Sequence, residues 1–212
     1  MSSRSHFLWL LAFGAILCIA SFWCDNAVIA WVAGHSSAQV KEVARFFTQW
    51  GDFLPIVSLL LVLMIAAWLV KRPFVMRLIA LMLGCAVVGG LAANVLRVLT
   101  GRARPWAKVP AGWYGLRDHG VWIAGSPGYS SFPSGHTAVA IACVAPLWVF
   151  LSPRMRVAAA APATVMALCI AASRILLNEH HLSDVLTSVW MGVVLGTLIC
   201  RRFAPWLRKA EI

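Results

Sequence analysis

The chain has 212 residues, of which 61% are hydrophobic and only 12% charged, and its mean hydropathy is +0.83. Soluble domains are usually about 45–50% apolar and about 25% charged, so a soluble or a disordered protein is excluded. The formal charge of +11 suits a nucleic-acid partner, but a soluble nucleic-acid-binding protein would not need continuous apolar runs. The composition predicts an integral membrane protein with no nucleic-acid partner.

Six apolar stretches are long enough, or nearly so, to cross a bilayer as helices, which takes about 17–25 residues. They are Phe7–Cys24, Phe53–Val70, Phe74–Leu99, Ser134–Leu151, Val157–Leu177 and Asp184–Cys200. We therefore predict an all-α protein, an integral membrane bundle of six transmembrane helices that forms a single domain over residues 1–212.

A further helix is predicted in the first outward connection. Ser36 and Gln39 have the spacing of a capping box at a helix start. Apolar side chains then recur at helical spacing, opposite Lys41, Glu42 and Arg45: Val40, Val43, Ala44, Phe47 and Trp50. The pattern favours an amphipathic helix on the membrane surface, with a plain connector helix outside the membrane as the alternative.

Basic residues are unevenly distributed over the two sides of the predicted bundle. Ten Lys and Arg, with Glu211 as their one acid, fall in the termini and the inward connections. The other eight Lys and Arg share the outward connections and their edges with the remaining six acids. Because basic residues accumulate on the cytoplasmic side, both termini are expected in the cytoplasm.

Polar residues collect in three clusters, all at the outward ends of predicted spans, where they are costly to place. The clusters are Arg97–Pro105, Pro133–His136 and Ser173–Asp184. Taken singly, each has an ordinary interpretation: arginines anchor helix ends, and serine or aspartate caps a helix start.

Taken together, the clusters suit the binding of a phosphate group. Ser134 and Gly135 put a hydroxyl and free backbone N–H groups at a helix start, where an anion binds readily. Arg97, Arg104 and Arg174 present planar donor forks that match phosphate oxygens.

Two histidines and an aspartate complete the set. His180 and Asp184 are four residues apart, so on a helix they would share a face and could hydrogen-bond. A carboxylate on one ring nitrogen would leave the other nitrogen as a nucleophile. His136, from a different span, would then be free to act as general acid. His181 is three residues from Asp184, and spacing alone leaves it as an alternative to His180.

These clusters resemble the signature of the type 2 phosphatidic acid phosphatase superfamily, which is K-x6-R-P, P-S-G-H and S-R-x5-H-x3-D. This sequence has Arg97-x6-Arg104-Pro105, Pro133-Ser134-Gly135-His136 and Ser173-Arg174-x5-His180-x3-Asp184. Ten of the eleven specified residues match in order and spacing. The difference is Arg97 in place of lysine, which keeps the charge but widens the donor group.

The resemblance implies a membrane lipid phosphatase that needs neither a metal nor a cofactor and works through a phosphohistidine. His180 would attack phosphorus and be oriented by Asp184, and His136 would protonate the leaving oxygen and then activate water. The phosphoryl oxygens would be held by Arg97, Arg104, Ser134, Gly135 and Arg174. The spacing of the family motif selects His180 over His181.

The expected partners are the bilayer and a phosphorylated lipid. Phosphatidate, phosphatidylglycerol phosphate, polyprenyl pyrophosphate and phosphorylated lipid A all occur as substrates in the resembled family, and the sequence does not choose among them. The expected location is the bacterial cytoplasmic (inner) membrane, with the active site facing outward.

Two alternatives remain. A phosphotransferase would pass the phosphoryl group from the histidine to an acceptor lipid instead of water. An anion or lipid transporter could use the arginines as a selectivity ring, but transporter sites lie near the midplane, often between repeats.

Overall fold

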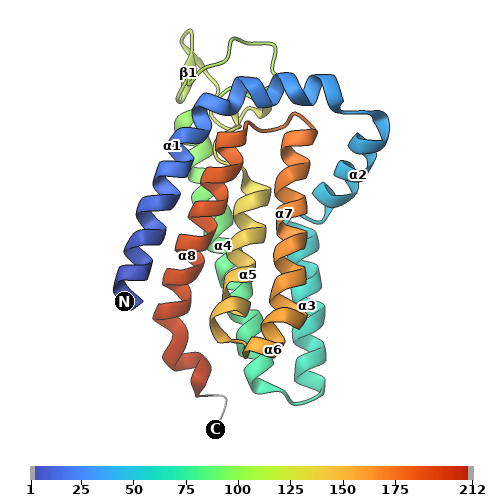
Figure 1. The fold of residues 1–212 in the computed structure, drawn as a ribbon, viewed down its shortest axis with the longest axis vertical. Coiled ribbons are helices and arrows are strands. Elements are labelled where there is room, and N and C mark those ends of the chain that lie inside the picture. The colour runs from blue at the N-terminus through green and yellow to red at the C-terminus, as the bar shows by residue number, and fades with distance from the viewer. Residues whose placement is uncertain (1–2, 210–212) are drawn as a thin grey trace.

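The computed structural model describes residues 3–209 and is almost entirely helical (Figure 1). The helices are α1 (Ser3–His35), α2 (Ala38–Gln49), α3 (Phe53–Leu69), α4 (Pro73–Thr100), α5 (Gly135–Phe150), α6 (Pro153–Met155), α7 (Ala161–Leu176) and α8 (Leu182–Arg208). A π-helical segment, η2 (Arg156–Ala160), joins α6 to α7. The α4–α5 connection contains a short turn, η1 (Pro127–Tyr129), and two strands, β1 (Arg117–Asp118) and β2 (Val121–Trp122). The strands pair antiparallel, Arg117 opposite Trp122.

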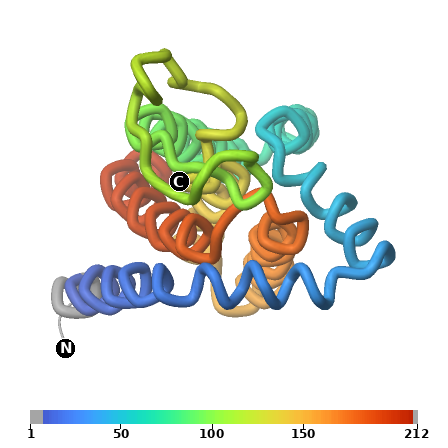
Figure 2. Tube along the Cα trace, turned by 90° about the horizontal axis from the view of Figure 1, so that it is seen from above, coloured from blue at the N-terminus to red at the C-terminus, as the bar shows by residue number. Residues whose placement is uncertain are grey.

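Helix α5 is the central element of the bundle, with α4, α7 and α8 packed around it (Figures 1 and 2). Small residues allow this close packing. A methyl group added at Gly192 of α8 would lie 3.0 Å from Ile141, and one at Gly196 would lie 2.5 Å from Ala145. Two glycines four residues apart let membrane helices approach to backbone contact. This packing fixes the position of α5 and α8 relative to each other, and both helices begin at the same end of the bundle.

The outside of the bundle is covered by large apolar side chains, such as Leu54 and Val157, each 74% exposed. Among residues 3–209, four helical segments are long and apolar enough to span a membrane: α1 from Leu8, α4, the segment Pro153–Leu176 and α8. Helices α2 and α3 qualify together as a pair bent by 52°, and α5 is apolar but shorter. The predicted all-helical membrane protein is confirmed, and the count of six spans stays a prediction.

Two helices extend beyond their predicted ends. Helix α1 continues past Cys24 to His35, and its second half runs across the end of the bundle (Figures 1 and 2). Neither proline nor glycine occurs between Cys24 and Gly34, so nothing in this stretch of sequence stops the helix earlier. Helix α8 continues past Cys200 to Arg208 and includes Pro205.

The helix predicted in the first outward connection is α2. Its cap is Ser37, whose Oγ accepts a hydrogen bond from the Val40 N–H at 3.3 Å, so the predicted capping box at Ser36 and Gln39 is wrong. Helix α2 packs against α7 and buries Ala44. Its placement on the membrane surface stays a prediction.

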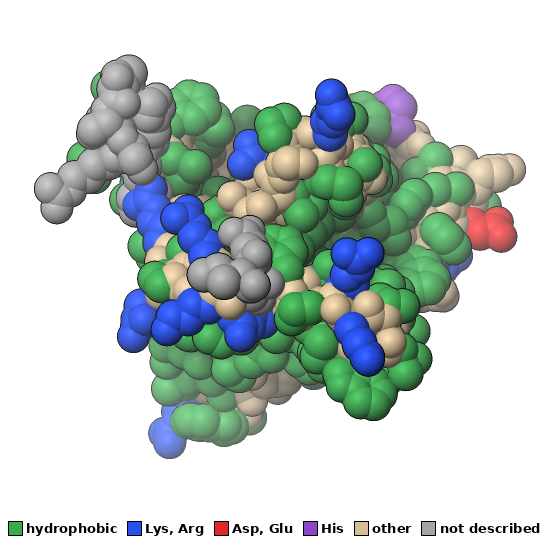
Figure 3. Space-filling view, turned by 90° about the horizontal axis from the view of Figure 1, so that it is seen from below, with side chains coloured by type: hydrophobic (Ala, Val, Ile, Leu, Met, Phe, Trp, Pro, Cys, Tyr) green, Lys and Arg blue, Asp and Glu red, His purple; other side chains and the backbone are tan. Residues whose placement is uncertain are grey.

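The two ends of the bundle differ in charge and in structure. Lys and Arg side chains gather at the end seen in Figure 3, where α6 lies and α8 ends. The α4–α5 connection lies at the opposite end, together with the second half of α1 (Figure 1). Glu211, the one acid counted on the basic side, lies outside the described residues.

Substitution of Gly196 by Ala tests the helix packing. The added methyl group would overlap Ala145, and overpacking of this kind costs about 1–3 kcal/mol. We expect a lower midpoint of thermal unfolding in detergent for Gly196→Ala. The matched control is Gly84→Ala in α4, where no atom lies within 4 Å of the added methyl group. Equal midpoints for the two variants would contradict the assigned packing of α8 on α5.

Candidate active site

The three polar clusters of the sequence meet at the end of the bundle where α4 and α7 end and α5 and α8 begin. The backbone N–H of Ser134 donates to the backbone carbonyl of Asp184 at 3.4 Å, which joins the starts of α5 and α8. Gly135 lies directly against Arg97, because a methyl group there would be 3.1 Å from the guanidinium. Glycine at this position therefore lets an α4 arginine reach the start of α5.

His180 is buried, with 2% of its surface exposed, in the connection between α7 and α8. Its Nδ1 donates to the backbone carbonyl oxygen of Ser131 at 2.6 Å. A carbonyl oxygen can only accept, so Nδ1 carries the proton and Nε2 keeps a free lone pair. Burial lowers the pKa of His180 from its ordinary value; the Asp184 carboxylate acts against this shift, and Arg174 and Arg104 act with it.

The predicted hydrogen bond between His180 and Asp184 is replaced by this backbone contact. Nδ1 of His180 lies 3.6 Å from Oδ2 of Asp184, which is close enough for a strong electrostatic interaction but is not a hydrogen bond. The reason is that α8 begins only at Leu182, so the two residues do not share a helical face.

Asp184 has no exposure to solvent, and both of its carboxylate oxygens accept hydrogen bonds. Oδ1 accepts from Nη1 of Arg102 at 2.5 Å. Oδ2 accepts from the hydroxyl of Ser131 at 2.5 Å and from the backbone N–H of His181 at 2.8 Å. Three donors around one carboxylate therefore fix its position beside His180.

His181 has a structural role at the start of α8. It is the N-cap of α8, and its side chain accepts a hydrogen bond from the backbone N–H of Asp184. This contact occupies one ring nitrogen and leaves the other free, as it does in His180. The choice of His180 over His181 therefore still rests on the spacing of the motif.

His136 lies in the first turn of α5, and its Nε2 is 2.8 Å from Oδ1 of Asp52. An ionised carboxylate only accepts, so Nε2 of His136 carries a proton in this contact. Asp52 comes from the bend between α2 and α3, a contact that the sequence motifs do not indicate.

Ser134 is fully buried at the N-cap of α5, but its side chain makes no capping hydrogen bond. Instead its Oγ accepts a hydrogen bond from the Thr137 hydroxyl at 3.0 Å. The hydroxyl proton of Ser134 therefore remains available as a donor.

The three arginines of the motifs are largely buried. Arg97 donates to Oδ1 of Asn94 at 3.2 Å, and Arg174 donates to the hydroxyl of Thr48 at 2.5 Å. The Nε–H groups of Arg97, Arg104 and Arg174 are buried without a partner among the described residues. Unsatisfied buried donors of this kind point to a missing acceptor, such as an anion.

Glu179 joins two of these arginines. Its carboxylate forms an ion pair with Arg104, and the same oxygen lies 3.5 Å from Nη2 of Arg174. The indole N–H of Trp106 donates to it at 3.2 Å. A carboxylate thus occupies part of the arginine cluster, directly before His180 in the chain.

A pocket of about 420 Å³ opens at Arg97 and His136. Its polar lining includes Asp52, Asn94, Arg97 and His136, and its apolar lining includes Phe53, Leu91 and Val139.

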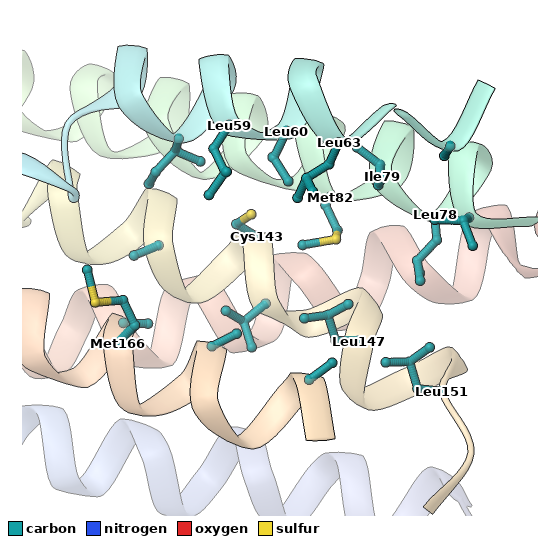
Figure 4. Close-up of a pocket in the computed structure, with 18 of the residues that line it drawn as sticks. Leu59, Leu60, Leu63, Leu78, Ile79, Met82, Cys143, Leu147, Leu151 and Met166 are labelled. Carbon is teal, nitrogen blue, oxygen red and sulfur yellow. The ribbon is translucent and has the colours of Figure 1, made fainter. Parts of the chain in front are cut away.

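A larger apolar groove of about 720 Å³ runs from Trp50 along α3, α4, α5 and α7. Figure 4 shows the side chains of this groove, among them Leu60 of α3, Met82 of α4, Leu147 of α5 and Met166 of α7. Neighbouring residues of the bend between α2 and α3 line the two cavities: Trp50 lines the groove, and Gly51 and Asp52 line the pocket.

Several polar neighbours of the site could not be found from the motifs: Asp25, Thr48, Asp52, Arg102, Ser131 and Glu179. Only Arg102, Ser131 and Glu179 lie within or beside a motif, and that nearness is the one signal the sequence offers. No group of three or more His, Cys, Asp or Glu side chains suited to a metal occurs among residues 3–209.

Comparison with known proteins places this geometry in a family. The model of the PAP2 superfamily matches residues 74–208. The chain is 30% identical over 175 residues to the lipid A 1-phosphatase of Rhizobium etli, a match that covers 76% of this chain and 70% of that protein. The lipid A 1-phosphatase of Rhizobium johnstonii is 29% identical over 187 residues, with 81% and 71% covered.

Two solved structures have the same fold. A transmembrane PAP2-type phosphatidylglycerolphosphate phosphatase from Bacillus subtilis matches with a TM-score of 0.70 at 22% identity, over 94% of this chain and 96% of that one. Aquifex aeolicus LpxE matches with a TM-score of 0.58 at 17% identity, over 84% and 94%. The resemblance seen in the motifs is confirmed: the chain belongs to the PAP2 superfamily and is a lipid phosphatase.

Proposed function

We propose that this enzyme removes a terminal phosphate from a membrane lipid through a phosphohistidine on His180, without a metal or a cofactor. The observation that carries the proposal is the hydrogen bond from Nδ1 of His180 to the Ser131 carbonyl. This bond leaves the Nε2 lone pair free, and an imidazole oriented in this way is a nucleophile.

In the first step, the Nε2 lone pair of His180 attacks phosphorus, and the bond from phosphorus to the lipid oxygen breaks on the opposite side. Protonated His136 gives its Nε2 proton to the departing oxygen. In the second step, His136 takes a proton from water, the water oxygen attacks phosphorus, and the P–N bond breaks. Inorganic phosphate leaves, and His180 recovers its free lone pair.

The remaining motif residues would bind the phosphoryl group. Arg97, Arg104 and Arg174 carry buried Nε–H groups without partners among the described residues, and Ser134 keeps a free hydroxyl proton. Together with the backbone at Gly135, these donors would stabilise the charge on the phosphoryl oxygens as it spreads in the transition state.

The shape of the site supports a lipid substrate. The polar pocket at His136 and Arg97 and the apolar groove are lined by neighbouring residues, Gly51 and Trp50, so a phosphate in the pocket and a hydrocarbon chain in the groove would suit one lipid. Two relatives are named lipid A 1-phosphatases, which makes a lipid A-type phosphate the first substrate to test. Phosphatidylglycerol phosphate, phosphatidate and polyprenyl pyrophosphate complete the panel.

The same intermediate would allow phosphoryl transfer to an acceptor lipid. Release of inorganic phosphate in detergent without an added acceptor distinguishes the hydrolase from this alternative.

We further propose six spans in the bacterial inner membrane, with both termini in the cytoplasm and the site facing outward. The excess of Lys and Arg at the end of the bundle opposite the site supports this orientation (Figure 3).

Substitution of His180 by Ala removes the proposed nucleophile. We expect phosphate release from the lipid panel to fall by at least about 10³-fold, and wild-type activity to survive a chelator. The matched control is His119→Ala, because the side chain of His119 is 96% exposed in the α4–α5 connection. Full activity in His180→Ala would refute the mechanism, and loss of wild-type activity on chelation would refute metal independence.

The lowered pKa of His180 predicts how the rate depends on pH. The group must be neutral to attack, and a lowered pKa keeps it neutral at pH values where an ordinary histidine would be protonated. We expect the acid limb of kcat/KM to have its midpoint below about 6.5, the ordinary histidine value. A midpoint at or above that value would contradict a buried His180 as the nucleophile.

Substitution of Glu179 by Gln tests whether its carboxylate competes with phosphate for Arg104 and Arg174. Removing this charge frees charge-assisted donors, which are worth about 1.5–3 kcal/mol each. We expect inorganic phosphate to inhibit Glu179→Gln about tenfold more tightly than wild type. The control is Glu42→Gln, which removes an exposed acid on α2. Weaker inhibition in Glu179→Gln would mean that Glu179 holds the arginines in place instead.

A further inference from the structure

We propose that Asp25 and Arg102, which lie outside the family signature, are positioning residues for this reaction. Arg102 holds Asp184 in place, and Asp25 holds Arg102 and balances its charge. The inference rests on the proposed function of His180 and Asp184.

Arg102 bridges two buried carboxylates. Its Nη1 donates to Oδ1 of Asp184 at 2.5 Å, and its Nη2 donates to Oδ2 of Asp25 at 2.6 Å. Asp25, Arg102 and Asp184 are exposed by only 4%, 7% and 0%. A carboxylate buried within an apolar helix is costly unless it is paired, so Asp25 depends on this contact.

Ser183 completes the connection between Asp25 and the start of α8. Its hydroxyl accepts a hydrogen bond from Nη1 of Arg102 at 2.7 Å and donates to Oδ2 of Asp25 at 2.6 Å. Its backbone N–H donates to Oδ1 of Asp25 at 2.9 Å. Asp25 therefore binds both Arg102 and the residue next to Asp184, and it does so from α1.

The guanidinium of Arg102 is also held by aromatic rings and by its backbone. Its Cζ lies 5.1 Å from the centre of the Phe22 ring and 4.7 Å from that of Trp113, within the range of cation–π attraction. The carbonyl of Arg102 accepts from the N–H of Ser131 at 3.1 Å. Because the carbonyl of Ser131 holds His180, Arg102 is linked to the nucleophile by a second route.

The charges explain why two acids share one arginine. A positive charge develops on the His180 ring as it takes up the phosphoryl group, and the negative charge of Asp184 stabilises it. An arginine paired with Asp184 alone would cancel that charge. Asp25 neutralises Arg102, so the three groups together keep one net negative charge beside His180.

The competing interpretation is purely structural: the cluster only fastens α1 to the bundle. In that case substitutions would lower the unfolding midpoint and leave kcat of the folded enzyme unchanged. If the cluster positions Asp184, kcat falls while KM changes little, because ground-state binding by the other arginines remains.

The test uses the full chain in detergent with Asp25→Asn, Arg102→Gln and the double variant. We expect kcat to fall about tenfold in Asp25→Asn and about 10²-fold in Arg102→Gln, the loss typical of a misplaced catalytic group. Because Asp25 acts through Arg102, the double variant should be no slower than Arg102→Gln. The matched control is Arg77→Gln, which removes a hydrogen bond to the backbone of Trp206 near the end of α8.

Binding of inorganic orthovanadate, which takes up the five-coordinate geometry of the transition state when it bonds to a histidine nitrogen, gives a readout that needs no lipid. Measured by protection against thermal unfolding, it should be about tenfold weaker in Arg102→Gln than in wild type. Additive effects of the two substitutions, unchanged kcat and vanadate affinity, or unfolding of both single variants would overturn the positioning role.

The same measurements separate this inference from the proposed function. If wild type binds vanadate through His180 but hydrolyses no lipid of the panel, the proposed substrate is wrong, and the vanadate affinity of Arg102→Gln still decides the inference. If His180→Ala binds vanadate as tightly as wild type, the proposed role of His180 fails, and the inference fails with it.

Discussion

A carboxylate that is buried at the start of a membrane helix must find hydrogen-bond donors for both of its oxygens, and Asp184 is in this position. Its donors are the guanidinium of Arg102, the hydroxyl of Ser131 and the backbone N–H of His181. Two of them belong to the long connection between α4 and α5. The hydrogen bonds to the Asp184 carboxylate therefore hold that connection against the start of α8 and place the carbonyl of Ser131 next to His180.

The packing of the bundle provides the base for these contacts. Small residues, such as Gly192 and Gly196 of α8, allow α5 and α8 to approach closely. The backbones of Ser134 and Asp184, at the starts of the two helices, therefore form a hydrogen bond. The motif residues lie at helix ends or in the connections between helices. Charges can be partly hydrated there, and backbone N–H groups are free.

The site contains more basic than acidic side chains. Its carboxylates have two different roles. Asp25 and Asp184 are buried and fully bonded, whereas Asp52 lines the pocket and contacts His136, and Glu179 contacts Arg104 and Arg174. The inner acids keep the geometry of His180, and the outer acids occupy groups that the phosphate would use. Unpartnered Nε–H groups on three arginines leave capacity for a further anion.

Much of the fold and of the candidate site could be predicted from the sequence, because the patterns that indicate them are local in the chain. A helix that crosses a membrane must be apolar along its length, so composition and runs such as Phe74–Leu99 determine a helical membrane protein. The motifs keep their reacting residues at fixed spacings on helix ends, so His136, His180 and the arginines could be named together. Helix ends were less predictable: α1 passes Cys24 because nothing local stops it.

Only the tertiary structure decided which groups touch. His180 bonds to the carbonyl of Ser131 and not to Asp184, because α8 starts two residues too late for the predicted pairing. Asp25 and Asp184 are 159 positions apart, and they share Arg102 because α1 packs against α8. By itself, the sequence determined a helical membrane protein and the set of candidate site residues, since both depend on composition and spacing. The partners that orient those residues come from distant segments, and only the packing of the helices brings them together.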